Sequence, residues 1–252
     1  MGGQQQVSVR ALGIGQPVWL FHSLLADAGS CLLLAQRLRL GYRVLLPDLP
    51  GFGGSAPAGP GLDAVADRMA TALEREAAPA VVFGNGYGSF VALVLALRRP
   101  DLVRRLVLAG TGAAFSAQGR AAFRSMAEAA GEHGLAAIAD MAMRRLFSPE
   151  FQERNPAVLA ERRARFIETR LGVFRGACEA LATLDLRDAV RGLEVPTLVM
   201  VGEQDEATPP AMARELASLL PDARLLELPG CAHVAQLQAP DTVFEAMRDF
   251  VG

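Results

Sequence analysis

The sequence of 252 residues contains no lysine, so all 25 of its basic side chains are arginine, against 27 acidic ones. The formal net charge is therefore −2, whereas a protein dedicated to nucleic acid or to an acidic surface normally needs a net positive face. We expect no nucleic-acid partner. The absence of lysine also removes one side chain that enzymes use as a base or as a nucleophile.

Cysteine and long apolar runs are scarce as well. The three cysteines, Cys31, Cys178 and Cys231, form no C-x-x-C pair, which fits a reducing compartment and suggests no zinc site. Residues 1–6 lack the basic and apolar regions of a signal peptide, and the longest apolar runs are far too short to cross a bilayer. We therefore expect a cytoplasmic protein with no membrane partner, no metal and no cofactor.

Short apolar runs alternate with longer segments of helical periodicity. Hydrophobic residues make up 51% of the chain, which is enough for a substantial core. Because the short runs are unbroken, they predict strands that are covered on both faces, as in a parallel sheet. These strands are predicted at residues 18–21, 44–46, 81–83, 106–108 and 197–201, with a weaker one at 225–228.

The segments between these strands predict helices. Their alternation with strands argues for right-handed crossovers, and hence for an α/β fold with a doubly wound, mostly parallel sheet. Before Pro17 only residues 7–12 read as a strand, which leaves one edge of the sheet open. An open edge would favour a dimer, and we expect a monomer or a homodimer. The helices are predicted at residues 31–40, 62–77, 87–98, 210–219 and 239–251.

From residue 113 to residue 183 no strand-like run occurs, and apolar residues recur at helical spacing. We interpret residues 113–183 as a helical cap inserted into a core made of residues 1–112 and 184–252. Arginines at 144–145 and 162–165 either grip an anionic ligand or, as we favour, lie on solvated helix faces. The large apolar side chains suggest an apolar cavity, although packing within the cap explains most of them equally well. They are Phe115, Met126, Met141, Met143, Phe147 and Phe174.

A glycine-rich corner follows the strand predicted at residues 81–83. The run Gly84-Asn85-Gly86-Tyr87-Gly88 connects this strand to the next helix, and a corner this tight brings two backbones close together and requires small residues. With serine at position 86, the run would be the G-x-S-x-G nucleophile elbow of the α/β-hydrolases. The corner therefore resembles that family.

The resemblance extends over nearly the whole chain. Residues 21–24 (FHSL) are similar to the oxyanion loop of the family, residues 47–55 (PDLPGFGGS) to its D-x-x-G-x-G-x-S turn, residues 195–205 (VPTLVMVGEQD) to the strand that ends in the catalytic acid, and residues 230–233 (GCAH) to the histidine loop. The order of nucleophile position, acid and histidine also matches. The resemblance implies an α/β-hydrolase fold with an inserted helical cap. Within the family, residues 23–24 and 185–188 make the chain most similar to 3-oxoadipate enol-lactonases and esterases.

Position 86 departs from the family, which carries Ser, Cys or Asp there, because glycine has no side chain that can attack a substrate. The resemblance assigns a dyad in which Asp205 holds the imidazole tautomer and His233 moves the proton. Two alternatives stay open. His233 is otherwise a loop histidine, and Asp205 a turn acid that caps the following helix, with Glu203 and Glu206 as close substitutes for it.

The oxyanion site needs backbone N–H groups rather than particular side chains. The resemblance places these groups at Leu24 and Tyr87. In the same loop, Ser23 and His22 are candidates for contact with the substrate, although a serine that starts a loop is more often a turn residue.

No replacement for the missing nucleophile is predicted. Ser89 lies one helical turn beyond the corner, where its side chain should be directed into helix packing. Cys31 and Cys231 have no adjacent base at a known spacing and are expected to be inert thiols. His133 has no partner motif and is expected on the surface.

Three functions are compatible with these residues. The first is an enzyme that acts on a small carbonyl compound, such as an ester or a lactone: His233 deprotonates a water held in the space left at Gly86, or the substrate itself, in a hydrolysis or a related lyase reaction. The second is a catalytically inactive protein that binds a small molecule. The third is an experimental variant of a serine hydrolase from which the nucleophile has been removed.

Overall fold

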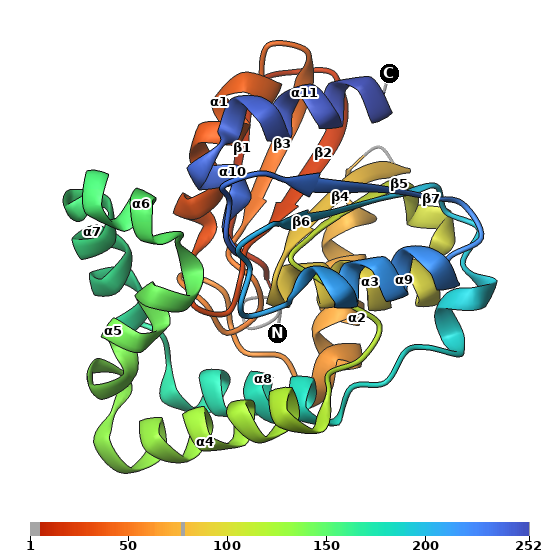
Figure 1. The fold of residues 1–252 in the computed structure, drawn as a ribbon. Helices are drawn as coiled ribbons and strands as arrows, with labels where there is room; N and C mark the ends of the chain where they lie inside the picture. The colour runs from red at the N-terminus through yellow and green to blue at the C-terminus, as the bar shows by residue number, and fades with distance from the viewer. Residues whose placement is uncertain (1–5, 77–78, 252) are drawn as a thin grey trace.

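The computed structural model describes residues 6–76 and 79–251. Within them, one sheet of seven strands has the order β1-β3-β2-β4-β5-β6-β7, and only the pairing of β1 with β3 is antiparallel (Figure 1). This confirms the predicted mostly parallel sheet. The strands are β1 (Val9–Leu12), β2 (Gln16–Phe21), β3 (Tyr42–Pro47), β4 (Ala80–Asn85), β5 (Val103–Ala109), β6 (Thr197–Gly202) and β7 (Ala223–Leu228).

Helices cover both faces of this sheet (Figure 1). One face carries α1 (Leu32–Leu38), α10 (Ala235–Gln238) and α11 (Pro240–Val251), and the other carries α2 (Gly61–Leu73), α3 (Tyr87–Arg98) and α9 (Pro210–Leu219). Successive strand residues therefore enter two different cores: Val18 and Leu20 pack with α1 and α11, whereas Trp19 packs with α2 and α3. This double burial explains why the strand sequences are unbroken apolar runs.

The predicted elements differ from the observed ones mainly at their ends. The six predicted strands at residues 18–228 lie within β2 to β7. The first predicted helix, at residues 31–40, is shorter than expected: residues 28–31 form a 3₁₀ turn before α1, and α1 ends at Leu38 in a turn that leads to β3. The second helix ends at Leu73, and Ala77, its predicted last residue, lies outside the described residues.

The first edge strand of the sheet is β1. It pairs antiparallel with β3, from Val9 opposite Pro47 to Leu12 opposite Val44. A turn through Gly13, with φ of 71°, then leads into β2, which pairs with β3 and β4 instead of β1. The predicted strand at residues 7–12 is thus a four-residue edge strand, and the oligomeric state stays a prediction.

Helices α4 to α8 follow β5 and precede β6 in the chain, and they form a layer of their own beside the sheet (Figure 1). The ends of this insertion meet where Ala114 forms an isolated antiparallel bridge with Asp185. We propose that this layer is the cap, with the boundaries predicted at residues 113 and 183. Its helices are α4 (Ala117–His133), α5 (Leu135–Leu146), α6 (Pro149–Arg154), α7 (Pro156–Ile167) and α8 (Leu171–Thr183).

One arginine run of the cap differs from our expectation of solvated helix faces. Arg162, on α7, is only 6% exposed and pairs with Asp27 of the core and with Glu161. Because the partner Asp27 lies 135 residues away in sequence, local periodicity gave no sign of this contact. Arg163 and Arg165 fit the expectation better, since the first is partly exposed and the second is exposed, and they pair with the exposed Asp140 and Glu168.

The part of the chain that the structure describes contains no helix that combines the length and the apolarity needed to span a membrane.

Candidate active site

Gly86 forms the sharp corner between β4 and α3. Its φ of 53° lies in the left-handed region, which suits glycine. Its N–H donates to the carbonyl of Ala109 at 2.9 Å, and its carbonyl accepts the backbone N–H and the hydroxyl of Ser89 at 2.8 and 2.6 Å. Ser89 is therefore engaged in the first turn of α3, as predicted, and Gly86 presents only its backbone to the site.

Gly88 allows the start of α3 to lie directly against the end of β2. A Cβ atom at this position would lie 2.5 Å from the carbonyl oxygen of Phe21 and 2.6 Å from that of His22, closer than real Cβ contacts allow. Since β2 and β4 are neighbouring parallel strands, with Phe21 opposite Gly84, this approach brings the loop after β2 beside Gly86.

His233 and Asp205 form a buried hydrogen-bonded pair. The Nδ1 atom of His233 lies 2.8 Å from Oδ2 of Asp205, and the two residues are 6% and 3% exposed. The other carboxylate oxygen, Oδ1, accepts the backbone N–H groups of Ala207 and Thr208 at 2.8 and 2.9 Å. Asp205 therefore has both of the roles considered above: Oδ1 caps the turn that precedes α9, and Oδ2 binds the imidazole of His233.

The carboxylate of Asp205 is held in its ionised form. Burial acts to raise its pKa, but the charge of His233 and the hydrogen bonds from His233 and Thr208 outweigh burial and leave the pKa below its usual value. An ionised Asp205 favours the tautomer with the proton on Nδ1, which leaves the lone pair of Nε2 free to accept a proton. The alternatives Glu203 and Glu206 are both exposed, and Glu203 accepts the backbone N–H of Gly230 instead.

Ser23 lies on the other side of the imidazole. Its Oγ is 3.4 Å from Nε2 of His233, and the residue is 2% exposed. A Cβ atom built on Gly86 would lie 2.4 Å from this Oγ and 2.5 Å from Nε2. The space that we expected to hold a water at Gly86 is therefore filled by the side chains of Ser23 and His233, which can approach each other because residue 86 has no side chain.

His22 supports the loop rather than the cavity. Its Nδ1 donates to the carbonyl of Ser23 at 2.9 Å, and its Nε2 accepts the N–H of Leu49 at 3.1 Å. Burial lowers its pKa, which agrees with a neutral ring that has one donor and one acceptor nitrogen. Both ring nitrogens are occupied by backbone groups, so the structure does not bring His22 to the substrate position predicted for it.

A small cavity of about 40 Å³ lies between the core and the cap. It brings together five of the predicted site residues, while Asp205 lies behind His233. Arg145 of α5 is the one charged side chain among its described lining residues, and it forms no ion pair with any residue in the ranges 6–76 and 79–251. The lining comprises Ser23, Leu24, Leu25, Gly86, Tyr87, Phe90, Phe115, Phe123, Met126, Arg145, Leu181, Ala207, Thr208 and His233.

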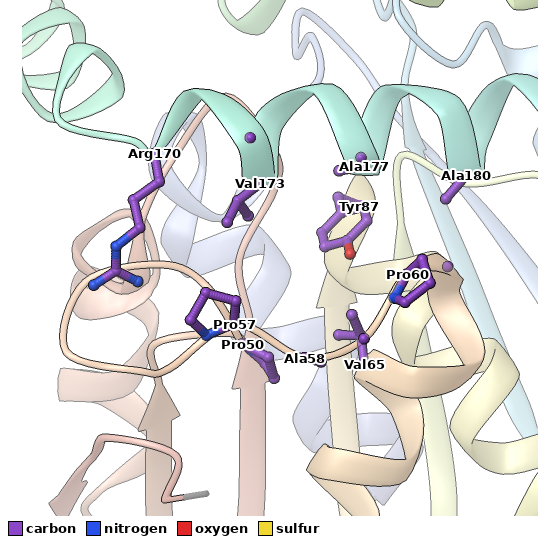
Figure 2. Close-up of a pocket in the computed structure, with 14 residues that line it drawn as sticks. Pro50, Pro57, Ala58, Pro60, Val65, Tyr87, Arg170, Val173, Ala177 and Ala180 are labelled. Carbon is purple, nitrogen blue, oxygen red and sulfur yellow. The ribbon is translucent and has the colours of Figure 1, made fainter. Parts of the chain in front are cut away.

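A larger hollow, of about 420 Å³, lies on another side of Tyr87, between α8 and the loop that precedes α2. Figure 2 shows Tyr87 and Val65 below α8, with Val173 and Ala177 on the helix above them. Arg170 reaches the edge of the same hollow, but its guanidinium donates to the carbonyls of Gly51 and Ser55 at 3.0 and 2.9 Å. Tyr87 lines both hollows, so a substrate in the larger one lies next to the histidine site.

The predicted apolar residues of the cap divide into two groups. Phe115 and Met126 line the small cavity, whereas Met143, Phe147 and Phe174 are buried in the packing of the cap and core. Met141 is only partly buried against the same core. Packing thus explains most of these residues.

The thiols and the remaining histidine lie outside the site. Burial raises the pKa of Cys31 to about 12 and also raises that of Cys231, so neither thiol ionises readily. His133, at the end of α4, is exposed, with Glu132 as its neighbour at 3.5 Å.

Sequence reasoning missed two polar residues that hold the histidine. Asn85, fully buried at the end of β4, donates to the carbonyl of His233 at 2.7 Å. Thr208 donates through Oγ1 to Oδ2 of Asp205 at 2.8 Å. The one signal in the sequence was Asn85 itself, because an amide at the end of an otherwise apolar strand needs buried partners.

Comparisons with known proteins agree with the observed fold. A family model described as "alpha/beta hydrolase fold" matches residues 16–240. A pimeloyl-[acyl-carrier protein] methyl ester esterase of Aromatoleum aromaticum is 32% identical over 97% of this chain and 97% of its own. 3-Oxoadipate enol-lactonase 2 of Acinetobacter baylyi is 28% identical over 82% and 78%. The crystal structure of the enol-lactonase of Burkholderia xenovorans LB400 is similar with a TM-score of 0.91 and 29% identity, over 97% of this chain and 96% of that one.

Proposed function

Because the chain belongs to the α/β-hydrolase family, we propose that it hydrolyses a small ester or lactone, with His233 as the general base and Asp205 as the residue that orients it. The observation that carries this proposal is the buried contact of 2.8 Å between Nδ1 and Oδ2. It leaves Nε2 beside a cavity at the boundary of core and cap. The similarity to esterases and an enol-lactonase supports the same reaction class.

We assign the oxyanion site to the backbone N–H groups of Leu24 and Tyr87, which would stabilise the negative charge that develops on the carbonyl oxygen of the substrate. Tyr87 is the first residue of α3, so its N–H has no acceptor within the helix and lies at the positive end of the helix dipole. Both residues line the cavity together with His233. Loss of one such donor typically costs about 3 kcal/mol of transition-state stabilisation.

His233 transfers the proton in both directions. Nε2 accepts the proton of the attacking hydroxyl, and the imidazolium then donates it to the leaving oxygen. Asp205 stays ionised throughout and stabilises the imidazolium, because its pKa is held below the usual value of a carboxyl group.

The walls of the cavity favour a particular class of substrate. Phe115, Phe123 and Met126 present apolar surface, which suits a short acyl chain. With about 40 Å³ the cavity is small, which favours a small acyl group. Arg145 has no ion-pair partner among the residues that the structure describes, and it therefore favours substrates that carry a second, anionic group.

Hydrolysis of p-nitrophenyl acetate, p-nitrophenyl butyrate and small lactones tests this proposal. We expect His233→Ala and Asp205→Asn to lower kcat/KM by about 10²- to 10⁴-fold. His133→Ala, which changes an exposed histidine of the cap, serves as the matched control and should keep full activity. Binding of these compounds without hydrolysis by the unaltered protein would instead support a catalytically inactive binding protein.

A further inference from the structure

The hydroxyl group beside the general base comes from the loop after β2, not from the corner after β4. Building on the proposed hydrolase function, we propose that Ser23 is the nucleophile and carries the acyl group during the reaction. It would take the role that the α/β-hydrolases assign to position 86, which is glycine in this chain.

Among the serine and threonine hydroxyls near His233 that the structure describes, those of Ser89 and Thr208 are engaged elsewhere, which leaves that of Ser23. Ser89 donates to the carbonyl of Gly86 at 2.6 Å, and Thr208 donates to Asp205 at 2.8 Å. The Oγ of Ser23 instead faces Nε2 of His233 at 3.4 Å. This distance is long for a hydrogen bond, but catalytic hydrogen bonds are often long without substrate and shorten in the complex.

The hydroxyl also lies where the reaction needs it. Ser23 Oγ is 2.4 Å from the position of a Cβ atom on residue 86, so it adjoins the volume that a side chain from the corner would occupy. Leu24 follows Ser23 in the chain, and Tyr87 follows Gly86, and both line the same cavity. A hydroxyl on residue 23 instead of residue 86 therefore opens onto the same cavity as the two residues to which we assign the oxyanion N–H groups.

The loop around Ser23 is held from several sides. The carbonyl of Ser23 accepts a hydrogen bond from Nδ1 of His22 at 2.9 Å and another from the N–H of Ala26 at 3.3 Å. Further along the loop, Asp27 pairs with the buried Arg162 of α7. A nucleophile needs such support, because a displacement of about 1 Å at a reacting group is costly.

The reaction balances with ester and water alone. Ser23 Oγ bonds to the carbonyl carbon and its proton passes to Nε2 of His233, while the carbonyl oxygen becomes the oxyanion. Collapse of this intermediate breaks the bond to the leaving oxygen, which takes the proton from His233 and departs as the alcohol. Water then attacks the acyl group on Ser23 and gives a proton to Nε2. This proton returns to Ser23 as the acid leaves.

Labelling with an alkyl fluorophosphonate, followed by peptide mass mapping of the full-length protein, tests the assignment. This reagent phosphonylates an activated serine with loss of fluoride. We expect the adduct on Ser23, its absence in Ser23→Ala and His233→Ala, and a fall in kcat for p-nitrophenyl butyrate of about 10³-fold or more in Ser23→Ala. Ser55→Ala is the matched control, since Ser55 is also buried but donates to the carbonyl of Asp48; it should keep both the adduct and the activity.

The two readouts separate this proposal from the hydrolase function. Hydrolysis that depends on His233 but not on Ser23, without an adduct on Ser23, would overturn the nucleophile and leave the hydrolase. An adduct on Ser23 without hydrolysis of any ester would support the nucleophile and overturn the hydrolase. An adduct on Ser89 or Cys231 would overturn Ser23. If Ser23→Ala does not fold, Ser23→Cys is used, and an acyl group from p-nitrophenyl butyrate is expected at position 23.

Discussion

The corner after β4 and the loop after β2 lie side by side at the ends of two paired strands, yet they offer different groups to the site. The corner presents only the backbone of Gly86, whereas the loop presents the hydroxyl of Ser23 at 3.4 Å from the base. In the family that the chain belongs to, the corner is the usual source of the nucleophile. The comparison suggests that the fold determines where the reacting groups meet, while neighbouring strand ends can each supply the hydroxyl.

Exchanging the side chains of residues 23 and 86 should have the largest effect, because it tests which of the two positions supplies the reacting hydroxyl. We expect Ser23→Gly to lower kcat/KM by about 10³-fold or more. Gly86→Ser alone should also be impaired, because its Cβ would lie 2.4 Å from Oγ of Ser23 and 2.5 Å from Nε2 of His233. The double variant Ser23→Gly/Gly86→Ser removes the contact with Ser23 and should regain at least about tenfold over Ser23→Gly.

Kinetics with p-nitrophenyl butyrate, together with thermal unfolding to verify the fold, decide this exchange. A Gly86→Ser variant that exceeds the unaltered protein, combined with full activity of Ser23→Gly, would contradict it. In that case the corner would be the natural place for the nucleophile, and Ser23 would be a neighbour without a catalytic role.

A smaller effect is expected from Arg145, which lines the cavity from the cap and not from the corner after β4 or the loop after β2. Arg145→Gln should raise KM by about tenfold for a p-nitrophenyl ester whose acyl chain ends in a carboxylate, because one charge-assisted hydrogen bond is worth roughly 1.5–3 kcal/mol. KM for the neutral ester of the same length should not change. Arg144→Gln, at the exposed neighbouring position, is the control. Equal changes for both esters would show that Arg145 does not bind the anionic group.

The smallest effect concerns the support of the loop after β2. Burial lowers the pKa of His22 from its ordinary value of 6.5, so below this pH the unfolded chain binds a proton that the folded chain does not. The free energy of unfolding should therefore fall as the pH decreases from 6.5 to the lowered pKa, by at most about 1.4 kcal/mol per pH unit.

Urea unfolding between pH 8 and pH 5 measures this dependence. His22→Asn should have a flatter profile than the unaltered protein, and the exposed His133→Ala should keep the original slope. An unchanged slope in His22→Asn would mean that another group is responsible for the pH dependence.

The sequence predicted the sheet and the histidine pair better than the loop between them. Unbroken apolar runs revealed β2 to β6, because both of their faces are buried. The edge strand β7 gave a weaker signal, because Arg224 and Leu225 are exposed and Glu227 interrupts its apolar residues. His233 and Asp205 were predicted because each directly follows a recognisable strand or loop motif. Ser23 was predicted only as a substrate contact, since its approach to His233 involves residues 210 positions apart in the sequence. The burial of Arg162 against Asp27 was missed for the same reason.

If the reaction passes through an acyl group on Ser23, water and methanol compete for that acyl group. Phenyl butyrate and p-nitrophenyl butyrate share an acyl group and differ in the leaving group, so a common acyl-enzyme must give both esters the same ratio of methyl butyrate to butyrate. We predict one ratio for both esters with the unaltered protein, and loss of this turnover in Ser23→Ala. A ratio that changes with the leaving group, with activity retained in Ser23→Ala, would show that water attacks the ester directly.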